Sequence, residues 1–93
     1  MRKIQKIFKA LSMKGAIDVY MLVYGGCQTE YYTNFNDLLR MTTFKPDALR
    51  RITNTLSRAK LIKSVKYGTG RGRYYIVSEK DSAHMIYTLI QEI

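Results

Sequence analysis

Apolar residues recur at helical spacing through the first part of the chain. On residues 2–12 they form one stripe between basic residues, which predicts an amphipathic helix. The members of this stripe are Ile4, Ile7, Phe8 and Leu11. Gly15 marks a break. The apolar run over residues 16–24 then predicts a mostly buried second helix that ends at Gly25 and Gly26, with a small strand near residues 31–32.

Two short helices follow, joined by a brief turn. Thr33 or Asn34 can cap the first of them, and Asp37 favours its positive N-terminal end. After the turn MTTFK, Pro46 suits the first position of the next helix, which runs to about Ala59. This part of the sequence therefore predicts helix, turn, helix.

The pattern changes from residue 61 onward. LIKSVKY and RYYIVS are rich in β-branched and aromatic residues and flank GTGRG, so they predict a hairpin with a glycine-rich tip. Beyond residue 78 the apolar positions return to helical spacing and predict a last helix. The 93 residues suffice for one domain with one core. The predicted fold class is α+β, mainly helical, with a single domain over residues 1–93.

The formal net charge of +9 comes from the middle of the chain. Residues 40–73 carry ten lysines and arginines against one acid, while basic and acidic residues balance elsewhere. A basic segment of this kind is expected to face nucleic-acid phosphates. A solvated basic surface with no partner is the other interpretation of the same distribution.

The helix over residues 46–59 has two distinct faces at 100° per residue. Its core face comprises Leu49, Ile52, Leu56 and Ala59. On the opposite face we expect Arg50, Arg51 and Asn54 to read bases, because Arg pairs with guanine and Asn with adenine in the major groove. Asp47 is a further base contact, or it stabilises the helix start or orients an arginine. Phosphate contacts are expected from Thr42, Thr43, Lys45 and Arg58.

The hairpin tip adds two more basic residues. Arg71 and Arg73 lie in the glycine-rich stretch over residues 67–73, which can enter a narrow minor groove or lie along the backbone. Tyr67 is expected to contact the sugar–phosphate backbone. GTGRG stands between two strands, with neither a following helix nor a Walker lysine, so it does not predict a nucleotide-binding loop.

This order of elements resembles the winged helix-turn-helix regulators of the HxlR, MarR and ArsR kind. The best matching segments are FNDLLRM, KPDALRRITNTLSRAKLIKSV and GRYYIVSEKD. Such proteins usually carry a capping Ser or Thr where this chain has Lys45, and often a glycine where it has Lys60. The resemblance implies a C-terminal β-hairpin wing, terminal helices, and dimeric binding to pseudo-palindromic operators. A small domain rich in lysine and tyrosine would also suit a thermophilic archaeon or one of its viruses.

The two ends of the chain offer more apolar surface than one small core needs. We expect this surface to form a homodimer interface, with completion of the monomer core as the alternative. The residues concerned are Ile4, Ile7, Phe8, Leu11, Met85, Leu89 and Ile93.

Catalytic and metal-binding chemistry is not indicated. His84 is the single histidine, and the acids show no paired arrangement, so no enzyme activity is expected. Cys27 lies far from His84 in sequence and makes no metal motif with it, so neither a metal nor a cofactor is expected. The longest apolar run carries Asp18 and is about half the length of a membrane span, so no membrane partner is expected. Lys6 and Lys9 interrupt the apolar residues near the N-terminus, so no signal peptide is expected there. The protein is therefore expected in the cytoplasm, and on the nucleoid when it is bound to DNA.

The sequence thus predicts a transcription regulator that binds double-stranded DNA. Two other functions stay open. A non-specific architectural DNA binder would bind all duplexes alike with a steep salt dependence. A winged-helix protein-interaction module would present an apolar or acidic surface where this chain has arginines.

Overall fold

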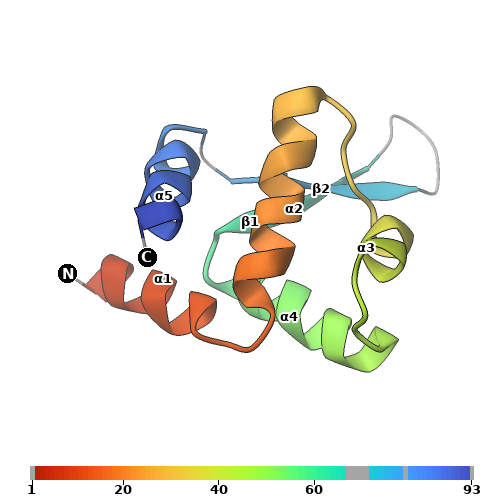
Figure 1. The fold of residues 1–93 in the computed structure, drawn as a ribbon, viewed down its shortest axis with the longest axis horizontal. Coiled ribbons are helices and arrows are strands. Elements are labelled where there is room, and N and C mark those ends of the chain that lie inside the picture. Colours follow the sequence, from red (N-terminus) through yellow and green to blue (C-terminus); the bar gives the residue numbers. More distant parts are fainter. Residues whose placement is uncertain (1, 67–71, 79, 93) are drawn as a thin grey trace.

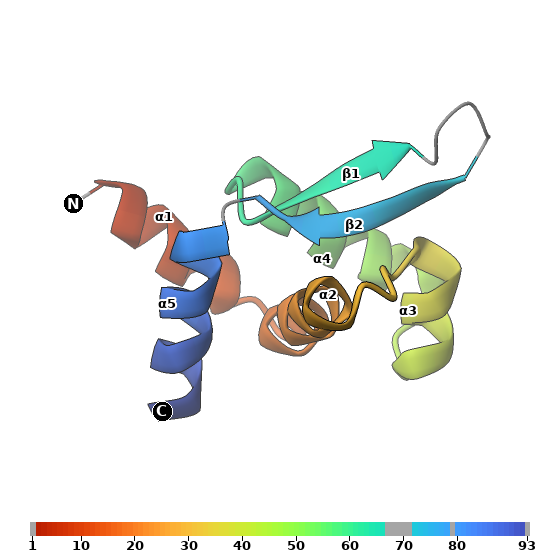
Figure 2. The ribbon, with the colours of Figure 1, turned by 90° about the horizontal axis from the view of Figure 1, so that it is seen from above.

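The computed structural model describes residues 2–66, 72–78 and 80–92, and the side chains of residues 5–66, 72–78 and 84–92. Along the chain it has α1 (Arg2–Leu11), α2 (Ala16–Thr29), α3 (Phe35–Met41), α4 (Pro46–Arg58), β1 (Ile62–Lys66), β2 (Arg73–Val77) and α5 (Lys80–Glu92). The central helix is α2 (Figure 1). Figure 2 shows the hairpin and α4 on one side of α2. In the same view α5 and α3 lie at opposite ends of the molecule, with α2 between them.

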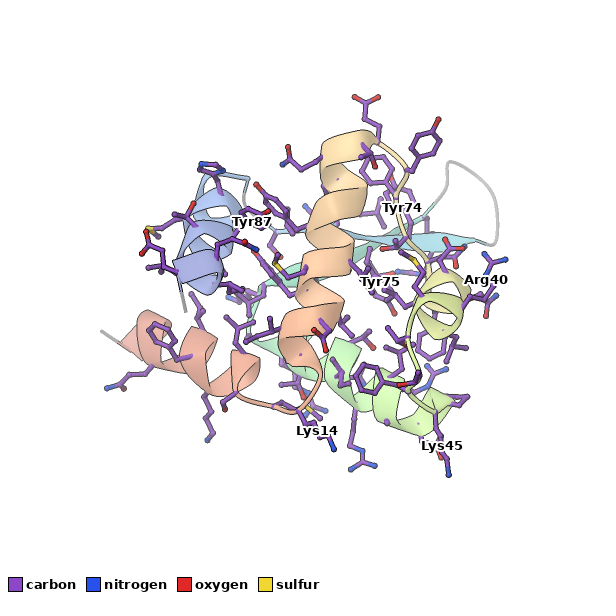
Figure 3. All side chains as sticks on the ribbon, in the orientation of Figure 1. Lys14, Arg40, Lys45, Tyr74, Tyr75 and Tyr87 are labelled. Atoms are coloured by element: carbon purple, nitrogen blue, oxygen red, sulfur yellow. The ribbon has the colours of Figure 1, made fainter. Side chains whose placement is uncertain are left out.

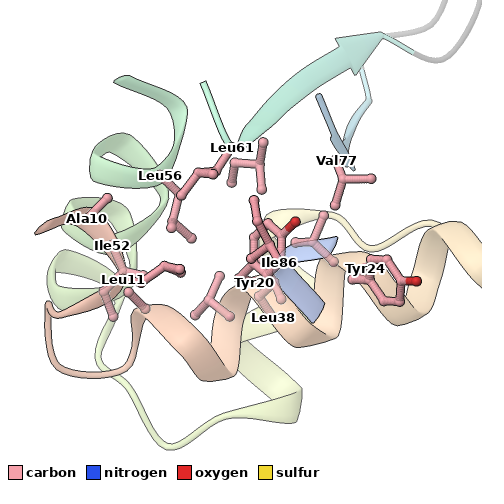
Figure 4. Packing of buried hydrophobic residues seen from close by; sticks show 14 of the residues in the cluster. Ala10, Leu11, Tyr20, Tyr24, Leu38, Ile52, Leu56, Leu61, Val77 and Ile86 are labelled. Atoms are coloured by element: carbon pink, nitrogen blue, oxygen red, sulfur yellow. The ribbon is translucent and has the colours of Figure 1, made fainter. Parts of the chain in front are cut away.

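The core gathers around α2 and receives side chains from each of the other helices and from both strands. Val19, Tyr20 and Val23 are fully buried along α2. Side chains packed with them include Leu11, Leu38, Ile52, Leu56, Ile62, Val77 and Ile86 (Figure 4). Burying each of the larger aliphatic side chains is worth about 1.5–3 kcal/mol, so one contiguous core holds the domain together.

The predicted end of the second helix is wrong. The helix continues through Gly25 and Gly26 to Thr29, and Glu30 then leaves it in a left-handed conformation at φ 63°. Gly26 lies beneath the segment that follows α2: a Cβ added there would stand 3.0 Å from the Tyr31 carbonyl oxygen. At this position the missing side chain permits a close backbone approach and does not terminate the helix.

A capping box opens α3, and Asn34 is the capping residue. Its Oδ1 accepts the Asp37 backbone N–H at 2.8 Å, and its own N–H donates to Asp37 Oδ2 at 3.1 Å. These two bonds satisfy amides that a helix start otherwise leaves unpaired. The prediction of a short third helix is confirmed, with Asn34 and not Thr33 as its cap.

The chain leaves α4 through a Schellman turn. The Leu61 N–H donates to the Leu56 carbonyl at 3.0 Å, and the Lys60 N–H donates to the Ser57 carbonyl at 3.0 Å. Lys60 occupies the left-handed position of this turn, at φ 62°, where glycine is the usual residue. The predicted helix from Pro46 to about residue 59 is confirmed.

The hairpin is antiparallel and runs in register from Ile62 opposite Val77 to Lys66 opposite Arg73. The small strand expected near residues 31–32 is reduced to one bridge, in which the Tyr75 N–H donates to the Thr33 carbonyl at 2.7 Å. This bridge ties the segment between α2 and α3 to the middle of β2.

Candidate nucleic-acid interface

The two faces of α4 differ as sharply as the sequence predicts. Leu49, Ile52 and Leu56 are buried, and Ala59 just beyond the helix is half-buried. The side chains exposed on the opposite face are those of Asp47, Arg50, Arg51, Asn54 and Arg58. Thr53 joins the buried face because its hydroxyl donates to the Arg50 carbonyl at 3.0 Å and so needs no water.

One flank of this exposed face adjoins α3. The Arg50 guanidinium lies over the Phe35 ring, with its Cζ 4.9 Å from the ring centroid. A cation above an aromatic face is attracted to the π electrons and keeps its N–H groups free for other acceptors. Phe35 therefore restricts where Arg50 can point without using its hydrogen-bond donors.

The basic side chains of α4 are not neutralised by the described part of the chain. The ion pair found among the described residues joins Arg40 to Asp37 within α3. The pKa of Asp37 is lowered, first by the Asn34 backbone N–H and then by Arg40. Arg40 is thus held on α3, whereas Arg50, Arg51 and Arg58 project without an acidic partner among the described residues.

The turn between α3 and α4 holds the predicted phosphate contacts. Thr43 and Lys45 are exposed, and Lys45 projects from the start of α4 (Figure 3). Thr42 is half-buried, and its hydroxyl donates to the Leu38 carbonyl at 2.7 Å. The proton of Thr42 is therefore committed to closing α3, which leaves its oxygen as an acceptor only.

Part of the predicted wing contact lies outside the described residues, namely Tyr67 and Arg71. Arg73 is described and exposed at the start of β2, where its Nη1 donates to Ser64 Oγ at 3.3 Å. It stands opposite Lys66, which is also exposed. The described base of the wing therefore carries two adjacent cations.

Sequence reasoning missed one cation beside α4. A hollow of about 400 Å³ is lined by Met13, Lys14, Thr43, Phe44, Ala48, Arg51 and Ile52. Lys14 comes from the turn between α1 and α2, outside the segment that carries the excess charge. The neighbouring Gly15 is the signal that points to this turn, because it marks where the chain turns back toward α4.

A second hollow, apolar and about 330 Å³ in volume, lies between α1 and α5. Its lining comprises Ile7, Phe8, Leu11, Ser12, Ile17, Met85, Ile86, Leu89 and Ile90. Phe8, Met85 and Leu89 are 53%, 60% and 44% exposed, whereas Leu11 is 8% exposed and belongs to the core. Ile93 and the side chain of Ile4, two further predicted interface residues, are outside the description.

Cys27 and His84 each have a partner within the fold. Cys27 Sγ accepts the Val77 N–H at 3.5 Å. His84 Nδ1 lies 3.3 Å from the Tyr24 hydroxyl, and the Tyr24 ring stacks on Tyr87 at 4.7 Å. The described residues hold no cluster of three or more side chains suited to bind a metal ion. Nor do they include a helix long and apolar enough to cross a membrane.

A helix–turn–helix pair followed by an antiparallel hairpin and flanked by terminal helices defines the winged helix-turn-helix fold. The fold is shared with HlyU from Vibrio cholerae, at a TM-score of 0.78 and 17% identity, over 97% of this chain and 90% of that one. HlyU from Vibrio vulnificus, described as a transcriptional regulator, matches at 0.75 and 17%, over 97% and 86%.

A third neighbour is the homodimeric winged helix-turn-helix DNA-binding domain of Mb0332 from Mycobacterium bovis, a possible ArsR-family transcriptional regulator. Its TM-score is 0.77 at 18% identity, over 97% of this chain and 76% of that one. No family model and no curated protein sequence matches the chain. The structural neighbours thus confirm the winged helix-turn-helix fold, while an archaeal or viral source stays a prediction.

Proposed function

We propose that this chain regulates transcription by binding double-stranded DNA, with α4 as the recognition helix in the major groove. The observation that carries the proposal is the exposed face of α4. Three arginines and an asparagine project there without acidic partners in the described part of the chain, opposite a face that is buried in the core. The neighbours described as transcription regulators or DNA-binding domains support the same function.

The side chains divide into two roles by chemistry. Arg50, Arg51 and Asn54 suit base edges, because each can form two hydrogen bonds to one base. Contacts to the DNA backbone are assigned to side chains at the edges of α4 and on the wing. There a positive charge or a hydroxyl group binds a phosphate, which carries no sequence information. These side chains comprise Thr43, Lys45, Arg58, Tyr67, Arg71 and Arg73, whereas the Thr42 hydroxyl, which donates its proton within α3, is left out of this set. Asp47, in the first turn of α4, either orients an arginine or contacts a base.

Fluorescence anisotropy with labelled duplexes tests this function. Wild type is titrated into random and selection-enriched duplexes at several salt concentrations, beside Arg51→Ala and the control Arg40→Ala. Loss of a bidentate base contact costs about 1–3 kcal/mol of discrimination, so Arg51→Ala should reduce the preference about 5- to 150-fold. Arg40→Ala removes the same side chain from α3 and should retain the preference.

The other outcomes favour the alternatives. Equal binding to all duplexes, with a steep salt dependence, would indicate a non-specific architectural protein. No binding near physiological salt would indicate a protein-interaction module. In either DNA-binding role the chain would act in the cytoplasm, where bacterial and archaeal DNA is held.

We further propose that two chains pair through the apolar hollow between α1 and α5. Phe8, Met85 and Leu89 expose apolar surface there, and a symmetric dimer would cover it and carry two recognition helices. The homodimeric neighbour supports this arrangement. Such dimers read half-sites roughly 34–36 Å apart.

Light scattering after gel filtration tests the dimer. Phe8→Glu should give a monomer at concentrations where wild type is dimeric, because a charge would be buried in the interface. Tyr31→Glu, at a highly exposed aromatic residue that lines a hollow beside α3, is the matched control. A dimeric Phe8→Glu protein, or a monomeric wild type, would contradict the proposal.

A further inference from the structure

The turn between α1 and α2 is fixed against the helix–turn–helix pair. Gly15 has φ +86°, and a Cβ added there would lie 2.3 Å from Phe44 Cζ and 3.0 Å from Ile52 Cδ1. Phe44 belongs to the turn before α4, and Ile52 belongs to α4 itself. The backbone at position 15 therefore packs on the Phe44 ring and on the end of the Ile52 side chain, and both this close approach and the positive φ favour glycine.

Hydrogen bonds hold the same turn from within. The Met13 N–H donates to the Ala10 carbonyl at 3.3 Å, and the Ala16 N–H donates to the Met13 carbonyl at 3.0 Å. Lys14 stands between these bonded residues. Its Cα is thus placed relative to α4 by packing and by backbone hydrogen bonds, while its side chain is exposed.

Lys14 adds positive charge to one flank of α4. It lines the same hollow as Arg51 and Thr43, and the described lining of that hollow contains no acid. Asp18, one turn into α2, lines a neighbouring hollow. In Figure 3, Lys14 and Lys45 project from the same lower edge of the molecule.

We infer that Lys14 binds a DNA phosphate at the edge of the major groove that α4 occupies. The inference rests on the proposed function. A helix is about 10–12 Å across and the groove about 12 Å wide, so phosphates border the helix on both sides. Arg50 defines the flank toward α3, and Lys14 and Arg51 define the other. A lysine ammonium on that flank neutralises a phosphate and leaves the Arg51 guanidinium for base edges.

The slope of log affinity against log salt concentration measures this contact. Each lost phosphate contact reduces the magnitude of the slope by about 1, hence by about 2 for the proposed dimer with its two copies of Lys14, and weakens binding to all duplexes alike. We expect that result for Lys14→Ala, on enriched and random duplexes. Lys6→Ala, which removes the same charge from an exposed position on α1, should leave the slope near that of wild type. Lys14→Arg should restore it.

Three results would overturn the inference. The first is a wild-type slope in Lys14→Ala, and the second is an equal loss in Lys6→Ala, which would reflect net charge alone. In both cases the proposed function stands, because wild type binds. The third is a wild type that binds no duplex, which ends both proposals. Because Lys14 is exposed, Lys14→Ala should melt at the wild-type temperature, and circular dichroism checks this.

Discussion

The guanidinium of Arg50 and the ring of Phe35 join the two helices of the helix–turn–helix pair. Phe35 is the first residue of α3, and Arg50 lies on the exposed face of α4 with its Cζ 4.9 Å from the ring centroid. An arginine that reads bases gains specificity when its conformation is restricted before binding, because less side-chain entropy is lost. Phe35 thus acts as a positioning residue for Arg50 under the proposed function.

Replacing Phe35 by leucine should weaken sequence discrimination more than it weakens overall affinity. A cation–π contact at an exposed site is worth about 0.5–1 kcal/mol, which corresponds to a two- to fivefold smaller preference for the enriched duplex. Anisotropy titrations at one salt concentration measure this ratio. Phe35→Tyr keeps the aromatic ring and should keep the preference. If the leucine and tyrosine variants discriminate equally well, the ring does not position Arg50.

Two adjacent glycines of α2 should respond in opposite ways to alanine. Gly25 has open space where a Cβ would stand, so Gly25→Ala should raise the free energy of unfolding by about 0.5–1 kcal/mol through helix propensity. Gly26 is buried, and a Cβ added there would stand 3.0 Å from the Tyr31 carbonyl oxygen, so Gly26→Ala should lower the free energy of unfolding. Urea denaturation of both variants measures the difference. Stabilisation by both substitutions would show that the segment after α2 moves aside at little cost.

These two glycines show which features of the fold local sequence signals can predict and which they cannot. Local signals placed most elements correctly: apolar spacing for α1, Pro46 for the start of α4, and β-branched residues for the hairpin. The predicted end of α2 was wrong because two adjacent glycines do not always terminate a helix. A glycine within a helix can also allow another segment to cross close to the helix backbone. That crossing involves Thr33, whose pairing with Tyr75 is a tertiary contact.

The same limit applies to the candidate site. The exposed face of α4 follows from helical periodicity alone, so its arginines could be predicted from the sequence. Lys14 could not, because it lines the same hollow as Arg51 only through the packing of Gly15 on Phe44, which is a tertiary contact. The contact between Phe35 and Arg50 likewise depends on the angle between α3 and α4, which no local pattern specifies.

Glycine at position 60 should stabilise the protein. Lys60 has φ 62°, a conformation that costs an L-residue about 1–2 kcal/mol, whereas glycine adopts it freely. This gain is partly offset, because the greater conformational freedom of glycine stabilises the unfolded chain by about 0.5–1 kcal/mol. Lys60→Gly should therefore raise the free energy of unfolding by roughly 0.5 kcal/mol. Lys63→Gly, an exposed lysine within β1, should lower it by up to about 1 kcal/mol. Equal effects of the two substitutions would argue against the left-handed turn.

The capping box of α3 should make part of the stability sensitive to acid. The Asn34 N–H, and secondarily Arg40, hold the pKa of Asp37 below its usual 3.8. A carboxylate with a lowered folded-state pKa stabilises the fold above the unfolded-state pKa, and this contribution is lost as pH falls through the folded-state pKa. Asp37→Asn retains an oxygen for the Asn34 N–H but removes the charge. Wild type should therefore be more stable than Asp37→Asn at pH 6, and the difference should shrink steadily below pH 3.8. Urea denaturation of both proteins from pH 6 down to pH 2.5 measures it, and a difference independent of pH would mean that the Asp37 charge does not contribute to the cap.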